Sequence, residues 1–193
     1  SFLQISKTVE LFLASLISTA SYTYFTFGNT LQLLPVGLFG TSIAKAALPT
    51  LSRQADEPNE FRKTLFGALY QIVFLILPVS TILIVLRIPL VRLIFGTDIF
   101  SWEDTVQTGM VVSAFGFGVV FQAVAALLAR GFYALHDTKT PVVISLSAII
   151  LVISVDFILI KGFGLPVWGL AAAFSLGSFL QAYLLFFLIN KII

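Results

Sequence analysis

Four ionisable side chains lie within long apolar stretches of this sequence, and they are the first candidates for a functional site. They are Lys7, Glu10, Lys45 and Asp156. A charged group inside a membrane is costly, so such residues commonly mark an ion path, a proton relay or a ligand site. A lysine there needs a carboxylate, water or an anionic ligand, whereas a carboxylate can hold a proton or a hard cation.

Lys45 ends a face of small and polar residues in the second apolar stretch. Gly37, Thr41 and Lys45 follow one another at intervals of four, which places them on one side of a helix. An anionic lipid head group fits a site of this kind. The alternative is that Lys45 extends its side chain to the membrane surface. Gly37, Gly40 and Pro49 interrupt the same stretch, which predicts a bend or a close helix contact.

The two carboxylates suggest a second role. Glu10 lies three residues after Lys7 on the same helix face, so the two form either an ion pair near the membrane surface or part of a cavity. Asp156 is either neutral, paired with a distant lysine, or a ligand for a coupling cation together with Glu10. Sodium or a proton would be that cation.

Little in the sequence suggests covalent or metal chemistry. It has no cysteine, and its single histidine, His136, lies in a loop beside Asp137 with no nucleophile near it. Gly116 and Gly118 fall in the middle of an apolar stretch, which predicts helix packing rather than a phosphate loop. We therefore expect no enzyme activity, no cofactor beyond the coupling cation, and no nucleic-acid partner.

Six long apolar stretches must position these residues. Hydrophobic residues make up 59% of the chain, charged residues 10%, and the mean hydropathy is +1.05, as in polytopic helical membrane proteins. A crossing helix needs roughly 20 apolar residues, and runs without alternation exclude a β-barrel. We predict an all-α polytopic membrane protein with a single domain over 1–193 and helices at about 2–27, 30–52, 61–87, 104–130, 140–160 and 166–190.

The links between the stretches contain ordinary helix-end signals. Gly28 and Asn29 are predicted to separate the first helix from the second. Asn59 is a candidate cap for the third helix. Ser101 with Asp104 fits a capping box at the start of the fourth. No link is long enough to divide the chain into separate domains.

The links between the six predicted helices lie on alternating sides of the membrane, and the two sides carry different numbers of basic residues. The side that holds both termini collects six basic residues and the opposite side three, so the positive-inside rule predicts both termini in the cytoplasm. Trp102 and Trp168 fall near helix ends, as interfacial anchors do. The six are Arg53, Arg62, Lys63, Arg130, Lys139 and Lys191, and the three are Arg87, Arg92 and Lys161.

Two segments resemble a known transporter family. The first runs over 34–44 as LPVGLFGTSIA and continues over 48–53 as LPTLSR. The second runs over 130–141 as RGFYALHDTKTP. Together they resemble the MurJ (MviN) lipid II flippases of bacterial peptidoglycan synthesis, within the superfamily of multidrug, oligosaccharidyl-lipid and polysaccharide exporters. The order and spacing of all six predicted helices fit the same family.

The resemblance implies a fold and a mechanism. The family has fourteen transmembrane helices, with two six-helix lobes facing each other across a central cavity. This chain resembles the second lobe, helices seven to twelve, which makes it a fragment whose partner is the missing first lobe. By alternating access, the lobes would move lipid II across the bacterial cytoplasmic membrane, with its pyrophosphate in a cationic cavity and its tail among the membrane lipids.

One departure from the family pattern concerns the start of the second helix. Where the family commonly has an acidic-basic pair, this chain has the uncharged Asn29 and Thr30. Lys45 then supplies the cavity charge, or the first lobe does, or the substrate is different. Glu10 matches a position where the family often has Asp. The alternatives to a lipid II flippase are an exporter of another polyprenyl-linked glycan or of small cations, and a membrane scaffold without transport.

Overall fold

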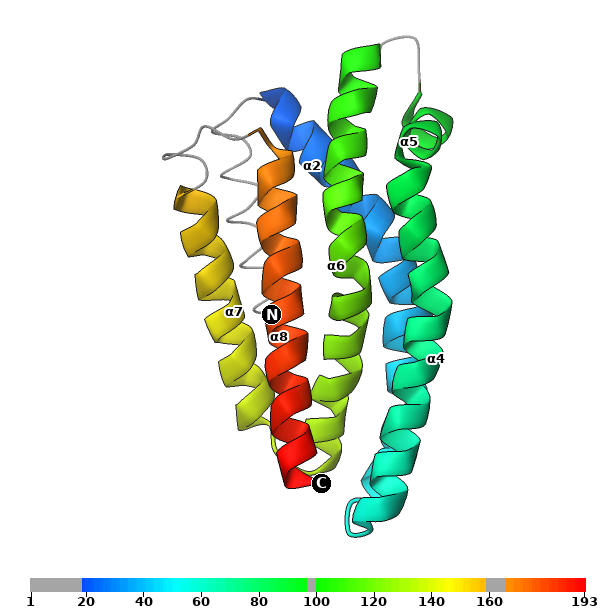
Figure 1. The fold of residues 1–193 in the computed structure, drawn as a ribbon, viewed down its shortest axis with the longest axis vertical. Helices are drawn as coiled ribbons and strands as arrows, with labels where there is room; N and C mark the ends of the chain where they lie inside the picture. Colours follow the sequence, from blue (N-terminus) through cyan, green and yellow to red (C-terminus); the bar gives the residue numbers. More distant parts are fainter. Residues whose placement is uncertain (1–18, 97–99, 159–165) are drawn as a thin grey trace.

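The computed structural model describes residues 19–96, 100–158 and 166–193, and every regular element in these ranges is a helix (Figure 1). The expected first helix therefore lies mostly outside the described residues. The elements are α2 (Thr19–Pro35), the π-helix η1 (Val36–Thr41), α3 (Ser42–Arg53), α4 (Pro58–Val85), α5 (Arg87–Phe95), α6 (Trp102–Ala134), α7 (Lys139–Ile158) and α8 (Trp168–Ile192).

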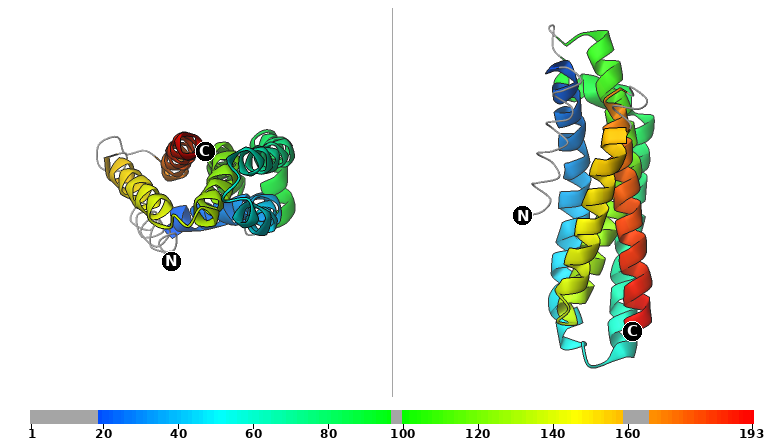
Figure 2. Two further views of the ribbon diagram at one scale, coloured as in Figure 1. Left: turned by 90° about the horizontal axis from the view of Figure 1, so that it is seen from below. Right: turned by 90° about the vertical axis from the view of Figure 1, so that its left-hand side faces the viewer.

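The long helices lie side by side in one elongated bundle. The segment formed by α2, η1 and α3 runs from one end of the bundle to the other, and α4 returns beside it (Figures 1 and 2). Then α6, α7 and α8 cross the bundle in alternating directions. Five helical segments among the described residues are long and apolar enough to cross a membrane, which confirms the polytopic all-α class.

Helix α6 is the centre of this bundle. It packs against α2, η1, α3, α4, α5 and α8, whereas α7 packs mainly against α8. The position follows from composition, because α6 combines large apolar residues with Gly109, Gly116 and Gly118, which let neighbouring helices approach closely. A Cβ atom at Gly116 would lie 2.7 Å from Ile84 Cγ1 of α4, so the expected packing role of this glycine is confirmed.

The predicted break at Gly28 and Asn29 is wrong. Helix α2 continues through both residues, and η1 and α3 extend it without interruption to Arg53. Gly28 is a packing residue rather than a helix terminator, since a Cβ atom there would lie 2.5 Å from Val111 Cγ1 of α6. In a membrane, a glycine of this kind is tolerated inside a helix because it lets two backbones approach.

The ends of the third predicted helix also need correction. Helix α4 begins at Pro58 with Glu57 before it, so Asn59 lies inside the first turn and is not the cap. The helix ends at Val85, and a separate short helix, α5, follows it directly. With nine residues, α5 is too short to cross a bilayer, so the pattern of long apolar stretches does not predict it.

The ends of α6 use two recognisable motifs. At the start, Ser101 Oγ accepts a hydrogen bond from the Asp104 amide while Asp104 accepts one from the Ser101 amide, which confirms the predicted capping box. At the other end, His136 has a φ of 61°. The amides of His136 and Asp137 donate to the carbonyls of Tyr133 and Phe132, which is the Schellman pattern of a helix C-terminus.

Candidate functional site

The segment 19–53 packs along α6 through two glycines. Gly28 meets Val111, and Gly40 meets Ala123, where a Cβ atom would lie 2.7 Å from Ala123 Cβ. Twelve residues separate the two contacts on each helix, so the segment and α6 run parallel and in register over this length. This packing fixes which side of the segment turns away from the bundle.

The side turned away from α6 carries most of the predicted substrate-binding residues. Thr30, Gly37 and Lys45 are exposed, and Thr41 is half-buried beside them. Asn29 is also half-buried, but its side-chain oxygen accepts a hydrogen bond from Gln32 Nε2 at 2.9 Å. The structure thus brings Thr30, Gly37, Thr41 and Lys45 to one face, whereas Asn29 is held by a neighbour on its own helix.

The π-helical segment η1 lies in the middle of this face. Thr41 Oγ1 and Ser42 Oγ both donate to the Gly37 carbonyl, at 3.0 and 3.1 Å. A π turn contains one residue more than an α turn, and π turns inside α-helices often occur at functional sites. Gly37 has open space around it, with no atom within 4 Å of a Cβ built there, whereas Gly40 is closely packed.

The threonine hydroxyl groups on this face already donate hydrogen bonds to backbone carbonyls of their own helix. Thr26 Oγ1 donates to the Tyr22 carbonyl at 2.8 Å, and Thr30 Oγ1 donates to the Thr26 carbonyl at 2.9 Å. With Thr41 bonded in the same way, these hydroxyls offer lone pairs rather than protons to a ligand. Lys45 therefore supplies the positive charge of the face, and among the described residues it forms no ion pair.

Lys45 lies near the level where a membrane's hydrocarbon meets its head groups. The span of 34 residues is about 51 Å long against a hydrocarbon core of about 30 Å, so about 10 Å extends beyond each side of a centred span. Lys45 comes eight residues before Arg53, about 12 Å from that end. At this depth its ammonium can reach the phosphate level, and this also agrees with the alternative of a side chain directed to the surface.

The predicted cation-coupling residues are not brought together with Lys45. Asp156 is completely buried near the C-terminal end of α7. Lys45 belongs to α3, whose link to α4 lies at the opposite end of the bundle (Figure 1). Glu10 and Lys7 lie outside the described residues. Within the described ranges, no group of three His, Asp or Glu side chains could hold a metal ion. Pro49 lies inside α3 with its ring exposed.

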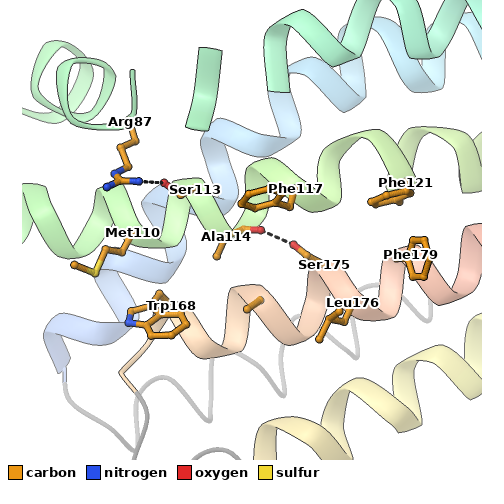
Figure 3. A pocket seen from close by; sticks show the side chains of 11 residues that line it. Arg87, Met110, Ser113, Ala114, Phe117, Phe121, Trp168, Ser175, Leu176 and Phe179 are labelled. Carbon is orange, nitrogen blue, oxygen red and sulfur yellow. Dashed lines mark hydrogen bonds between the residues drawn. The ribbon is translucent and has the colours of Figure 1, made fainter. Parts of the chain in front are cut away.

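Two polar contacts between helices were not anticipated from the sequence. Tyr24 Oη of α2 donates to Asp104 Oδ1 of α6 at 2.5 Å. Arg87, at the start of α5, donates through Nη1 to Ser113 Oγ of α6 at 3.1 Å and lies at one end of a groove (Figure 3). Neither pair has a sequence signal, because eighty and twenty-six residues separate the partners.

The fold and this face define a class of protein. Several membrane-crossing helices surround α6, and one of them has an irregular turn at mid-span beside an exposed face with a single lysine. Irregular helices near the bilayer midplane are typical of the substrate-facing helices of secondary transporters. The chain is thus a multi-pass helical membrane protein with an irregular turn in the helix that carries the exposed lysine.

Comparison with known proteins identifies the family. The family model described as "Lipid II flippase MurJ" matches residues 1–193, and the chain belongs to that family. Relatives named "Probable lipid II flippase MurJ" include one from Vibrio cholerae, 31% identical over 185 residues, and one from Thermotoga maritima, 30% identical over 172 residues. These matches cover 95% and 89% of this chain but only 35% of each relative.

A solved structure supports the same assignment. The structure titled "Lipid II flippase MurJ, inward closed conformation" superposes with a TM-score of 0.87 at 26% identity. The match covers 97% of this chain and 40% of the solved one. The chain therefore spans just over a third of the length of the relatives it matches, and the family locates it in the bacterial inner membrane.

Proposed function

We propose that this chain is one lobe of a lipid II flippase, which moves a lipid-linked peptidoglycan precursor across the bacterial cytoplasmic membrane by alternating access. The observation that carries the proposal is the family match over all 193 residues, together with the structural similarity at a TM-score of 0.87. The remaining lobe of the protein would face the exposed side of α2, η1 and α3. Transport then belongs to the whole protein and not to this chain alone.

Lys45 has the charge and depth to contact the substrate pyrophosphate. An ammonium near the head-group level meets a phosphate group of a lipid-linked substrate in the adjacent leaflet, while the hydrocarbon tail stays in the bilayer. On the same face, the residues two turns and one turn before Lys45 are Gly37 and Thr41. Their side chains are small or polar, which leaves room for the sugar groups to pass. Thr30 and Asn29 continue the same region without charge.

Asp156 is the described candidate for coupling transport to a cation. A carboxyl group with no exposed surface inside a membrane helix is costly when ionised, so its protonation or its binding of sodium can bias the position of α7. Glu10 is the second candidate. Replacement of each by its amide in the full-length protein should remove the dependence of transport on pH or on sodium, and dependence that survives both changes would reject the coupling role.

The orientation follows from the basic residues. Arg53, Arg62 and Lys63 gather at the same end of the bundle as Arg130 and Lys139 (Figure 1). The positive-inside rule supports the proposal that this end lies in the cytoplasm, together with the C-terminal end of α8. Lys45 lies towards this end, so its ligand would be the substrate in the inner leaflet, before transport.

The test uses the full-length protein in a bacterium depleted of its own lipid II flippase. The unchanged protein should restore growth and make lipid II accessible to an externally added enzyme that cleaves it. Lys45→Gln should reduce that accessible lipid II about 10-fold or more, since a charged hydrogen bond contributes about 1.5–3 kcal/mol, and Lys45→Arg should retain most of it. Lys63→Gln, an exposed lysine on α4, is the matched control.

The possible results separate the protein's function from the role of one residue. Failure of the well-expressed unchanged protein to restore growth would reject lipid II as the substrate and favour another lipid-linked glycan. Full activity of Lys45→Gln would leave the function standing and exclude Lys45 from substrate binding. Equal losses in Lys45→Gln and Lys63→Gln would show that the effect comes from surface charge in general.

A further inference from the structure

A long apolar groove lies between α6 and α8, on the side of α6 away from the segment 19–53. Its volume is about 580 Å³. The α6 residues that line it, such as Phe117 and Phe121, are on nearly the opposite helix face from Val111 and Ala123, which contact the segment. The groove is thus separate from the face that carries Lys45.

Small residues form the floor of the groove. Ser175 of α8 packs onto Gly118 of α6, where a Cβ atom would lie 2.6 Å from Ser175 Oγ, and this hydroxyl donates to the Ala114 carbonyl at 2.6 Å (Figure 3). Ala172 lines the groove one turn earlier. Because these side chains are short, the two helices lie close while a channel stays open above their contact.

The two ends of the groove differ in chemistry. At one end lie Arg87 and Trp168 (Figure 3). They are the first residues of α5 and α8, which begin near one end of the bundle, where a membrane surface is expected (Figure 1). At the other end, Phe121 and Phe179 meet edge to face, with ring centroids 5.0 Å apart. The groove is therefore open and cationic towards the membrane surface and closed by aromatic rings towards the bilayer centre.

The length of the groove matches one membrane leaflet. From Met110 to Phe121 it follows α6 for eleven residues, about 16 Å. Half of a hydrocarbon core is about 15 Å, so a single acyl chain fits between the two ends. Phe117 and Leu176 are exposed along the rim and would cover such a chain.

Arg87 has hydrogen-bond donors to spare for an anion. A guanidinium group has five N–H donors, and Ser113 Oγ accepts from one of its nitrogen atoms, Nη1. Among the described residues, Arg87 forms no ion pair. Ser113 in turn donates to the Gly109 carbonyl at 3.1 Å, so this bond keeps the guanidinium at the mouth of the groove.

We propose that this groove binds an anionic membrane phospholipid, with its phosphate on Arg87 and one acyl chain between α6 and α8 as far as Phe121 and Phe179. The bound lipid would join α8 and α6 to the junction of α4 and α5. It is a structural lipid and not the transported substrate, because the groove opens on the side away from the Lys45 face. The site combines a cationic side chain for the phosphate with an apolar groove for the acyl chain, and no single helix provides both.

The experiment measures lipid binding by the delipidated full-length protein, using native mass spectrometry and thermal stability in detergent. Phosphatidylglycerol should bind and raise the melting temperature, and phosphatidylcholine should bind at least several-fold more weakly. Arg87→Gln should weaken phosphatidylglycerol binding about 10-fold, as expected for the loss of a charged hydrogen bond, and Arg87→Lys should weaken it less. Arg62→Gln, an exposed arginine of α4 outside the groove, should leave binding unchanged.

Two further measurements identify the acyl chain and its place. Glycerol phosphate without acyl chains should not stabilise the protein, and Ala172→Phe should fill the groove and reduce phosphatidylglycerol binding. Equal binding of the glycerol phosphate would show a simple phosphate site, and equal binding by Arg87→Gln would overturn the proposal. Absence of any lipid effect in the unchanged full-length protein would likewise overturn it. Since the readout is binding, these results do not depend on transport.

Discussion

Gly37 and Gly40 lie three residues apart in η1 and have opposite surroundings. Gly37 borders open space, and Gly40 is held against Ala123 and Ile76. One glycine therefore keeps the exposed face small, and the other lets the segment 19–53 approach α6. At the residue scale, the same residue type has two different physical roles within a single turn.

This difference predicts opposite effects of the same substitution. Gly40→Ala should destabilise the full-length protein by about 1–3 kcal/mol because the added methyl group overlaps Ala123. Gly37→Ala should be neutral or should stabilise it by up to about 1 kcal/mol, since alanine favours a helix and meets no neighbour. Thermal melting in detergent measures both, and equal melting temperatures would contradict the packing role of Gly40.

Asp137 links the end of α6 to the start of α7. Hydrogen bonds from Thr140, and then from Lys139, lower the pKa of its carboxyl group below the ordinary value. A lowered folded-state pKa means that the stabilisation is fully present above the unfolded value of about 3.9 and is lost as the pH falls through the folded value.

The expected result is a loss of melting temperature between about pH 5 and pH 3 that is larger in the unchanged protein than in Asp137→Asn. At pH 7, Asp137→Asn should melt at a lower temperature because an amide accepts the same amide protons less strongly. Melting curves at several pH values test this. Parallel curves for the two proteins would exclude a contribution from this carboxylate.

At the scale of the elements, η1 keeps one face of the segment 19–53 on α6. Gly28, Gln32, Val36, Gly40 and Ala44 are all buried and recur every four residues. In a regular α-helix with 3.6 residues per turn, an interval of four moves the face by about 40° each time. The wider π turn rotates less per residue, which offsets this drift midway along the segment.

Deletion of one residue from η1 tests whether the π turn is needed for packing against α6 or for transport. Deletion of Leu38, which is 67% exposed, should convert η1 to an α turn and leave the residues on both sides facing α6 as before. We expect a melting temperature close to that of the unchanged protein and a loss of growth in the flippase-depleted strain, if the π turn serves transport.

A matched deletion elsewhere gives the contrast. Phe74 is exposed in the regular helix α4, which has no extra residue to lose. Its deletion should rotate one part of α4 by about 100° against the other and strongly reduce the melting temperature. If deletion of Leu38 is as destabilising as deletion of Phe74, η1 is needed for packing. If it preserves growth, η1 is not needed for transport.

For the molecule as a whole, the distribution of charge sets the predicted orientation in the membrane. The links at 54–57 and 135–138 lie at one end of the bundle, and the start of α6 lies at the other (Figure 1). Since the chain contains no cysteine, single cysteines introduced in or beside these segments report their side without background within this lobe.

The predicted labelling pattern has two parts. In intact cells, a maleimide that cannot cross the inner membrane should label Glu103→Cys and should not label Asn59→Cys or Thr138→Cys, all of which are exposed positions. All three should react after the inner membrane is permeabilised, which controls for their accessibility. The reverse pattern would invert the orientation and place Lys45 towards the outer leaflet.

Part of the candidate site could be predicted from the sequence. The intervals between Gly37, Thr41 and Lys45 correctly placed them on one side, because helical periodicity is a local property. The same reasoning could not place Asp156, whose surroundings come from other helices. From the sequence, Arg87 is only a basic residue at the end of the predicted helix 61–87, since its groove exists only when α8 lies against α6.

The sequence alone determined the membrane class, the family and the approximate positions of α4, α6, α7 and α8. Hydropathy summed over a span and the motifs of residues 34–53 and 130–141 depend only on neighbours in the chain. Only the tertiary structure decided that the helix continues through Gly28, that it contains the π turn η1, and that Arg87 lies at the open end of a groove. These features depend on which residues of α6 face each helix, and such contacts join residues that are far apart in the chain.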